Sequence, residues 1–249
     1  MDKEKRLRDF IQANHPIVMT YLERNYQRLT CLAGNKVEVI QSLFLSALEA
    51  AGGSVPIDAK YTSCKTFSGN LFKLPNKDAF TFTEFADCFI NDFSRPSKLS
   101  DMAQHFIKGD DKSSYPHFGY KKTHLFLKEL ILLGGSNLFT DFKVDEYLAH
   151  LSVPIDAVLR KVYWELKSID GKIKTCHDKD IQSLATQLFD DQAILFDDVW
   201  FWGHFCFNKT VLLETGNEKM IVTDSILTPV LIKEQSLMKR CSEFINIIR

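Results

Sequence analysis

The chain has 249 residues, 45% of them hydrophobic and 25% charged, a composition typical of globular proteins rather than of disordered or fibrous ones. No apolar run reaches the ~18 residues of a membrane span, and the charged start Met1–Arg8 has no apolar core behind it, so we expect a cytoplasmic protein without a secretory signal. The net charge of −1 argues against a general nucleic-acid coat.

The chain begins with helical patterns of unequal strength. Residues 4–32 favour one or two helices, because Pro16 interrupts the apolar spacing. Residues 36–51 predict a strongly apolar helix that ends at a pair of glycines. Residues 53–78 are rich in turn-forming residues and weakly patterned, so we expect a long surface connection there.

The middle of the chain predicts two helices around a polar loop. Before them, residues 83–93 favour an aromatic-rich helix capped by Thr81 or Thr83. A helix over 99–108 and an amphipathic helix over 121–133 then flank the loop that ends at Gly119. We expect a hairpin motif at about 110–133, which includes this loop and the helix after it.

The last part of the chain predicts further helices and one short β-hairpin. The expected helices cover residues 143–151, 155–166, 178–189, 195–206 and 229–248, and the hairpin covers 210–223. The sequence therefore favours an all-α fold, a single helical unit of two lobes over 1–249, with room for one small C-terminal β-hairpin.

Neither the cysteines nor the histidines show the spacing of a metal site. The six cysteines are widely separated: Cys31, Cys64, Cys88, Cys176, Cys206 and Cys241. Tight zinc or iron–sulfur loops need ligands a few residues apart, and disulfides are rare in a reducing compartment, so buried thiols are expected. His117 and His124 have no suitably spaced partner ligand. We expect no metal and no cofactor.

Two lysines open the helix at 121–133. The N–H groups at a helix N-terminus favour a phosphate, and the positive local field lowers the pKa of an amine placed there. Lys122 is therefore a candidate nucleophile, with Lys121 as the alternative. The other interpretation is a solvated helix start, and a second basic run, which includes Arg160 and Lys161, has the same two interpretations.

A carboxylate and an aromatic helix follow later in the chain. Asp156 comes after Pro154 at the start of the helix over 154–166, and it is either a plain N-cap or a carboxylate that stabilises a developing sugar cation. Asp198 and Trp202 lie four residues apart and hence on one helical face. Such a pair can read an extruded nucleobase, and it can equally belong to a core helix.

In their order, these segments resemble the helix–hairpin–helix DNA glycosylases, and within them the archaeal-type 8-oxoguanine DNA glycosylase/lyase branch. The resemblance covers about residues 80–206 and rests on Lys122-Thr123 with Phe126, on Pro154-Ile155-Asp156, and on Asp198 with Trp202. It implies a catalytic Lys122 and Asp156, and a base pocket at Phe126, Pro154, Asp198 and Trp202, with Gln27 as a base reader. DNA contacts would come from Gly119, Lys121, Arg160 and Lys161.

The chain also departs from this family. The hairpin usually carries two glycines, whereas here it reads Pro116-His117-Phe118-Gly119-Tyr120, and the iron–sulfur cysteines of the endonuclease III relatives are missing. The family has a second pocket lysine on the same helix as the attacking one. Here it would fall near Lys128, but the spacing differs from the family's by one residue.

The resemblance implies a monomeric, bifunctional DNA N-glycosylase/lyase that excises a damaged base, 8-oxoguanine above all, from double-stranded DNA through a lysine Schiff base. Two alternatives stay open: a glycosylase for a different modified base, and a non-catalytic helical module that binds DNA or protein.

Overall fold

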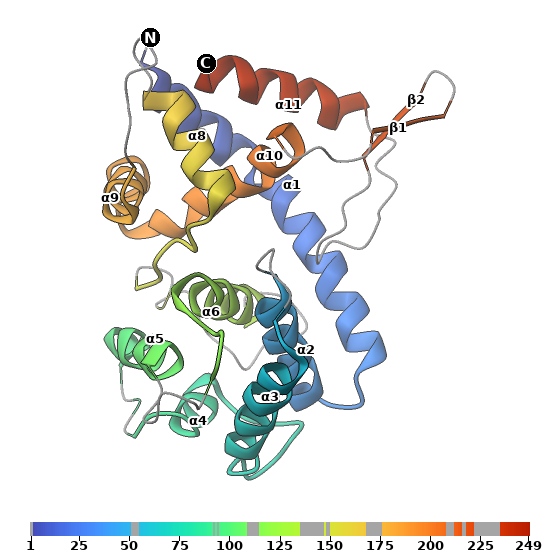
Figure 1. The fold of residues 1–249 in the computed structure, drawn as a ribbon, viewed down its shortest axis with the longest axis vertical. Helices are drawn as coiled ribbons and strands as arrows, with labels where there is room; N and C mark the ends of the chain where they lie inside the picture. The colour runs from blue at the N-terminus through green and yellow to red at the C-terminus, as the bar shows by residue number, and fades with distance from the viewer. Residues whose placement is uncertain are drawn as a thin grey trace. The chain divides into compact units, whose positions relative to one another are not determined.

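The computed structural model describes residues 2–50, 55–91, 93, 95–108, 115–134, 147, 150–167, 176–207, 212–215, 218–221 and 235–249. The chain folds into two compact units: Met1–Leu22 together with Ile155–Arg249 form unit 1, and Glu23–Pro154 form unit 2. Both are mainly helical, as the sequence predicts (Figure 1). None of the described helices has the length and apolarity to cross a bilayer.

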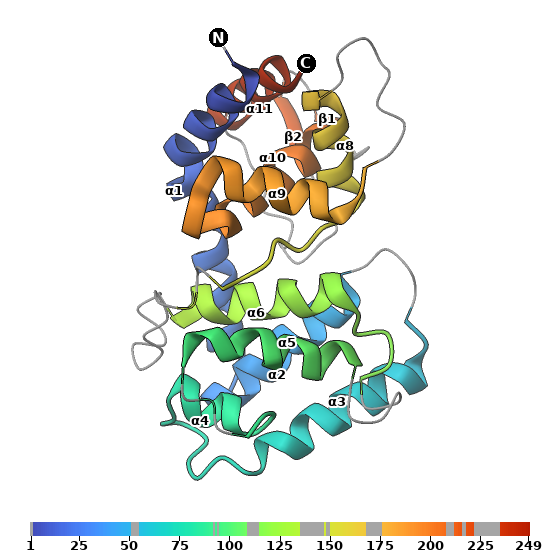
Figure 2. The same ribbon diagram turned by 90° about the vertical axis from the view of Figure 1, so that its left-hand side faces the viewer.

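Unit 2 is built around helix α6 (Tyr120–Gly134), most of whose residues are buried. Helices α2 (Lys36–Glu49) and α5 (Leu99–Lys108) pack against α6, and α3 (Ile57–Leu71) packs against α2. Figure 2 shows α5 and α6 side by side. The unit also holds α4 (Phe82–Asp87), the 3-10 turn η1 (Pro96–Lys98) and the last residues of α1 (Lys3–Leu32).

Stacked phenylalanines hold unit 2 together. The ring centroid of Phe44 from α2 lies 4.0 Å from that of Phe67 and 4.5 Å from that of Phe118, both in stacked geometry. Phe126 from α6 meets the edges of Phe44 and Phe67 at 5.5 Å each. Aromatic pairs in such geometries contribute about 0.5–1.5 kcal/mol each beyond the burial of their surface. The cluster therefore fixes α2, α3 and α6 against one another.

Helix α3 occupies the stretch where the sequence predicts a surface connection, and that prediction is wrong. Its residues have weak intrinsic helix patterning, because serine, threonine, glycine and asparagine are frequent in it. The helix instead presents Ser63, Phe67 and Leu71 to the core at a spacing of four. Tertiary packing through Phe67 outweighs the poor local propensity.

The structure decides between one and two helices at the start of the chain, and it shortens the aromatic-rich helix. Helix α1 runs through Pro16 without a break, with Phe10, Ile11 and Val18 buried on both sides of the proline. Thr81 caps α4 through a capping box with Glu84, but the helix ends at Asp87. There the Asp87 carboxylate accepts the N–H of Phe93 at 2.8 Å, which ties down the chain after the helix.

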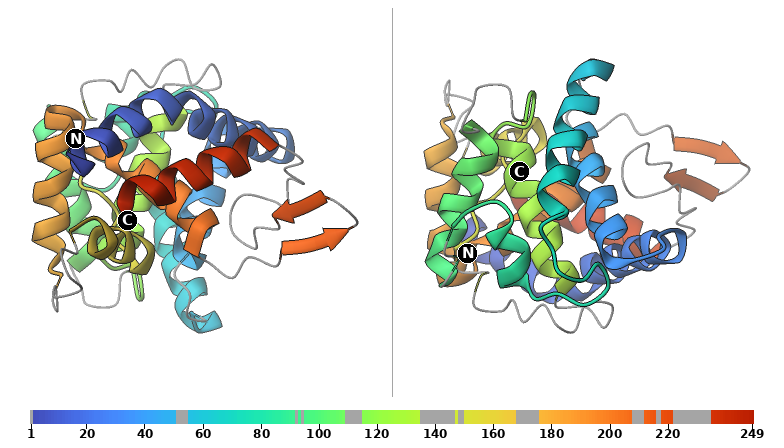
Figure 3. Two further views of the ribbon diagram at one scale, coloured as in Figure 1. Left: turned by 90° about the horizontal axis from the view of Figure 1, so that it is seen from above. Right: turned by 90° about the horizontal axis from the view of Figure 1, so that it is seen from below.

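Unit 1 packs α10 (Asp198–Phe207) against both α8 (Ala157–Lys167) and α11 (Gln235–Ile248). Helix α9 (Asp178–Phe189) continues into the 3-10 helix η2 (Asp190–Asp197), which leads into α10. Strands β1 (Leu212–Thr215) and β2 (Glu218–Ile221) pair antiparallel, with Leu212 opposite Ile221, where the sequence favours a hairpin (Figure 3). The helix expected at 143–151 and the start of the one expected at 229–248 fall largely outside the described residues.

Candidate active site

The turn before α6 is shaped by a histidine rather than by the glycine. Phe118 donates its N–H to the carbonyl of Tyr115 at 3.1 Å, which closes a turn around Pro116 and His117. His117 has a positive φ of 64°, the left-handed conformation that glycine usually supplies. Gly119 is exposed, and a Cβ at that position would meet nothing within 4 Å. The turn is anchored to α3, since the Ser63 hydroxyl donates to the Pro116 carbonyl at 3.1 Å.

The side chain of Lys122, in the first turn of α6, is mostly buried and has no counter-ion among the described residues. Only 6% of its surface is exposed, and no hydrogen bond or ion pair joins its ammonium to another residue in the described part of the chain. Burial lowers the pKa of Lys122, and the nearby charges of Lys121 and Lys60 lower it further. A larger fraction of this amine is therefore neutral at a given pH than of an ordinary lysine.

The two neighbouring lysines differ from Lys122. The Nζ atom of Lys60 pairs with the Glu49 carboxylate at 2.8 Å. The Nζ atom of Lys121 lies 3.5 Å from the carbonyl oxygen of Ala50, at the end of α2. Both therefore reach acceptors while still raising the positive potential around Lys122. This contrast favours Lys122 over Lys121 as the reactive amine.

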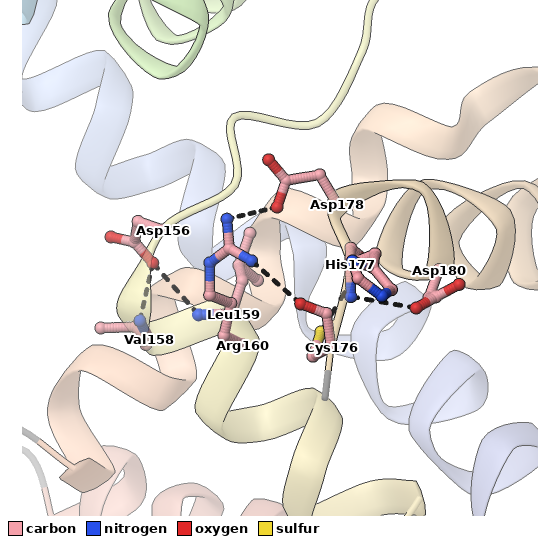
Figure 4. Close-up of polar contacts among 8 residues, drawn as sticks. All are labelled: Asp156, Val158, Leu159, Arg160, Cys176, His177, Asp178 and Asp180. Carbon is pink, nitrogen blue, oxygen red and sulfur yellow. Dashed lines mark hydrogen bonds and ion pairs between the residues drawn. The ribbon is translucent and has the colours of Figure 1, made fainter. Parts of the chain in front are cut away.

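Asp156 is the N-cap of α8, one of the two roles that the sequence leaves open. Its Oδ1 atom accepts the N–H groups of Val158 at 2.8 Å and Leu159 at 3.1 Å (Figure 4). Its Oδ2 atom accepts the indole N–H of Trp200 from α10 at 2.8 Å. Three N–H donors therefore fix the orientation of this half-buried carboxylate. The helix cap uses only Oδ1, and Oδ2 binds Trp200.

A histidine completes the surroundings of Asp156. The ring of Trp200 stacks on His204, one helical turn later, with 4.9 Å between the centroids. Burial lowers the pKa of His204, and the negative charge of Asp156 works against that effect. Asp156, Trp200 and His204 thus form one polar cluster in unit 1.

Arg160 and Lys161 have different surroundings. The Arg160 guanidinium donates to the Cys176 carbonyl at 3.3 Å and forms an ion pair with Asp178 in the first turn of α9 (Figure 4). Its charge is therefore already matched within unit 1. Lys161 is exposed, as a residue that contacts phosphate needs to be.

The residues expected to read the base are mostly in the cores of the two units. Trp202 is fully buried, with its ring edge-on to Phe10 at 5.2 Å, and Asp198 accepts from His15 Nδ1 at 2.8 Å. Phe126 is fully buried in the phenylalanine cluster, and Pro154 is buried as well. Gln27 is exposed on α1. Burial explains Phe126 and Trp202 as packing residues, so we leave both out of the site.

The comparisons with known proteins do not extend this picture. No family model, no curated protein and no solved structure matches the chain. Among the described residues, no group of three or more histidine, cysteine, aspartate or glutamate side chains could hold a metal ion. Lys122 belongs to unit 2 and Asp156 to unit 1.

Sequence reasoning missed Lys60, Trp200 and His204. Lys60 lies in the segment that lacks a helical pattern, so nothing in the sequence places it beside α6. Trp200 belongs to the aromatic helix already singled out, and its indole N–H needs an acceptor when it is half-buried. That requirement was the available signal, although it does not name Asp156.

Proposed function

We propose that the protein is a DNA glycosylase/lyase in which the amine of Lys122 is the nucleophile. The observation that carries this proposal is the state of that side chain: mostly buried, without a counter-ion in the described part of the chain, and with its pKa lowered by burial and by two neighbouring lysines. A lysine that forms a Schiff base needs an unprotonated amine, and desolvation next to other cations supplies one.

The proposed reaction begins with extrusion of a damaged nucleotide, 8-oxoguanine in the favoured case, at a cost of a few kcal/mol. The neutral amine of Lys122 attacks C1′ of the sugar, and the glycosidic bond breaks as the base leaves with the electron pair and takes up a proton. The amine loses a proton, the sugar ring opens, and an imine links the lysine to C1′. Loss of a C2′ proton then expels the 3′ phosphate by β-elimination.

Asp156 has the second part in the proposal. Its fixed carboxylate would face the positive charge that develops on the sugar and lower the energy of that charge. The hydrogen bonds from α8 and from Trp200 support this role, because a carboxylate that is already oriented needs no rearrangement during the reaction.

Borohydride trapping tests the proposal directly. Wild-type protein is incubated with duplex DNA carrying 8-oxoguanine and then reduced, and a covalent protein–DNA adduct is expected. Lys122→Gln and Lys122→Arg should both abolish the adduct, since neither side chain can form the imine. Lys121→Gln is the matched control and should keep it. A full adduct with Lys122→Gln would overturn the assignment, and circular dichroism checks that each variant is folded.

One observation favours a second candidate, a non-catalytic DNA-binding module. Asp198 and Trp202 have structural partners in unit 1 and present no free base-reading surface. A panel of lesion duplexes separates the candidates. Salt-dependent binding without an adduct on any lesion would support the module, whereas an adduct on a different lesion would support a glycosylase of another specificity.

A further inference from the structure

Unit 2 contains a small cavity on the face of α6 away from Lys122. It has a volume of about 120 Å³ and lies between α5, the start of α6 and residues 150–152. Leu99 and Leu127 form part of its apolar wall, and Gln104, Tyr120, His124 and His150 are among its polar lining residues. Tyr120, His124 and Leu127 share one face of α6, because they are spaced by four and three residues.

The imidazole of His124 is the unusual group in this cavity. The side chain is only 7% exposed, and no hydrogen bond joins either ring nitrogen to a residue that the structure describes. Its Nδ1 atom is sealed from solvent. Burial lowers the pKa of His124 to about 4, so the ring is neutral at pH 7 and carries a single N–H. Because Nδ1 is sealed, Nε2 is the ring nitrogen that a molecule in the cavity could reach.

The size and shape of the cavity restrict that partner. Drug-sized ligands occupy about 300–1,000 Å³, so this cavity admits a much smaller molecule. Tyr120, 39% exposed, brings its ring centroid to 4.2 Å from that of His124 and adds an aromatic wall. Aromatic walls favour flat rings by stacking. Since the sealed Nδ1 has no acceptor within reach, the N–H is best placed on Nε2, where water or a ligand can accept it.

We propose that this cavity binds a single planar ring carrying a carbonyl oxygen, the chemical class to which the pyrimidine bases belong. The carbonyl accepts the N–H of His124, and the ring lies against Tyr120 between the leucines of α5 and α6. The site is distinct from Lys122, and its occupancy does not require the glycosylase chemistry.

Uracil is the probe for this site. Saturation-transfer NMR should show contact between uracil and the protein, and titration should shift the signals of His124 and Leu127. His124→Phe keeps a ring of similar size without the nitrogens, and it should weaken uracil binding about tenfold. Ser42→Ala, in a different groove of unit 2, is the control and should bind as wild type does.

One further variant and one further ligand complete the test. Ala103→Leu should fill the cavity and block uracil even if His124→Phe fails to fold. Benzene, which is flat but lacks an acceptor, should bind more weakly than uracil. No saturation transfer to wild-type protein, or equal binding by wild type and a folded His124→Phe, would overturn the proposal. Lys122→Gln should bind uracil normally, so the lysine chemistry and this site can fail separately.

Discussion

The indole N–H of Trp200 and two N–H groups in the first turn of α8 bind opposite oxygens of the same Asp156 carboxylate. The bond from Trp200 spans 44 positions of sequence and links α10 to the start of α8. Asp156 is therefore both a helix cap and a tertiary contact within unit 1. This double engagement allows its structural and chemical roles to be separated by substitution.

Asp156→Asn should change the free energy of unfolding little and the rate of base excision greatly. The amide oxygen can still cap α8, while its NH₂ group faces the indole N–H, so we expect a loss of about 1 kcal/mol. Excision should slow by orders of magnitude if the carboxylate stabilises a sugar cation. Urea unfolding measures the first effect and single-turnover excision the second. Asp156→Ala also loses the helix cap, so it should lower the free energy of unfolding by about 2 kcal/mol. Activity that only follows the folded fraction would contradict a chemical role.

Trp200→Phe should release one side of the Asp156 carboxylate. The ring that stacks on His204 remains, but the hydrogen bond is lost, at a cost of about 1 kcal/mol. We expect slower excision with unchanged DNA affinity. Trp164→Phe is the matched control, because Trp164 is 43% exposed. Equal excision by both variants would show that the indole N–H does not position Asp156.

The pair of His15 and Asp198 should make unit 1 less stable in alkaline solution. The hydrogen bond to Asp198 raises the pKa of His15, against the opposing effect of burial. The stabilisation is complete below the unfolded pKa of about 6.5 and is lost as the pH rises through the higher folded pKa. Urea unfolding between pH 6 and 9 should show this loss, and His15→Gln should remove it. A His15→Gln curve parallel to that of wild type would refute the assignment.

His124 should make unit 2 less stable in acidic solution. Its folded pKa of about 4 lies below the usual value, so the unfolded state binds the extra proton first as the pH falls. Stability should therefore decline between about pH 6.5 and pH 4, by about 3 kcal/mol in total. His124→Phe should flatten this decline, while His177→Phe in unit 1 should leave it. Acid unfolding followed by fluorescence measures both slopes.

Phe126→Ala should destabilise unit 2 by about 3–5 kcal/mol, since it opens a cavity in the centre of the phenylalanine cluster. Phe72→Ala is the control, because Phe72 is 75% exposed and its loss should cost no more than about 0.5 kcal/mol. Thermal unfolding compares the two variants. If Phe126→Ala keeps wild-type stability yet fails to recognise a lesion, Phe126 belongs to the base pocket after all.

The sequence predicted those elements whose local pattern agrees with their packing. Helices α5 and α6 have apolar residues at helical spacing, and their observed bounds lie within a residue of the predicted ones. Helix α3 was missed because its stability comes from Phe67 against Phe44, a contact between separate elements that periodicity cannot show. Pro16 left open whether residues 4–32 form one helix or two, and they form one because burial on both sides of the proline outweighs the lost hydrogen bond.

The sequence likewise predicted only some features of the candidate site. Lys122 was expected at a helix start with a lowered pKa, and both features are present. Two of the three causes of that shift, burial and the charge of Lys60, depend on how the helices of unit 2 pack, which the sequence does not reveal. Asp198 and Trp202 share a helical face as expected, but that face packs into unit 1. A helical pattern shows which side chains are neighbours, not whether they face solvent.

The turn that leads into α6 obtains its left-handed residue from His117, so its geometry does not depend on Gly119. An alanine at 119 would cost little, and a glycine at 117 would relieve strain. Related chains can therefore keep this turn while losing the paired glycines by which such turns are usually recognised, and a search for that glycine signature would pass over them.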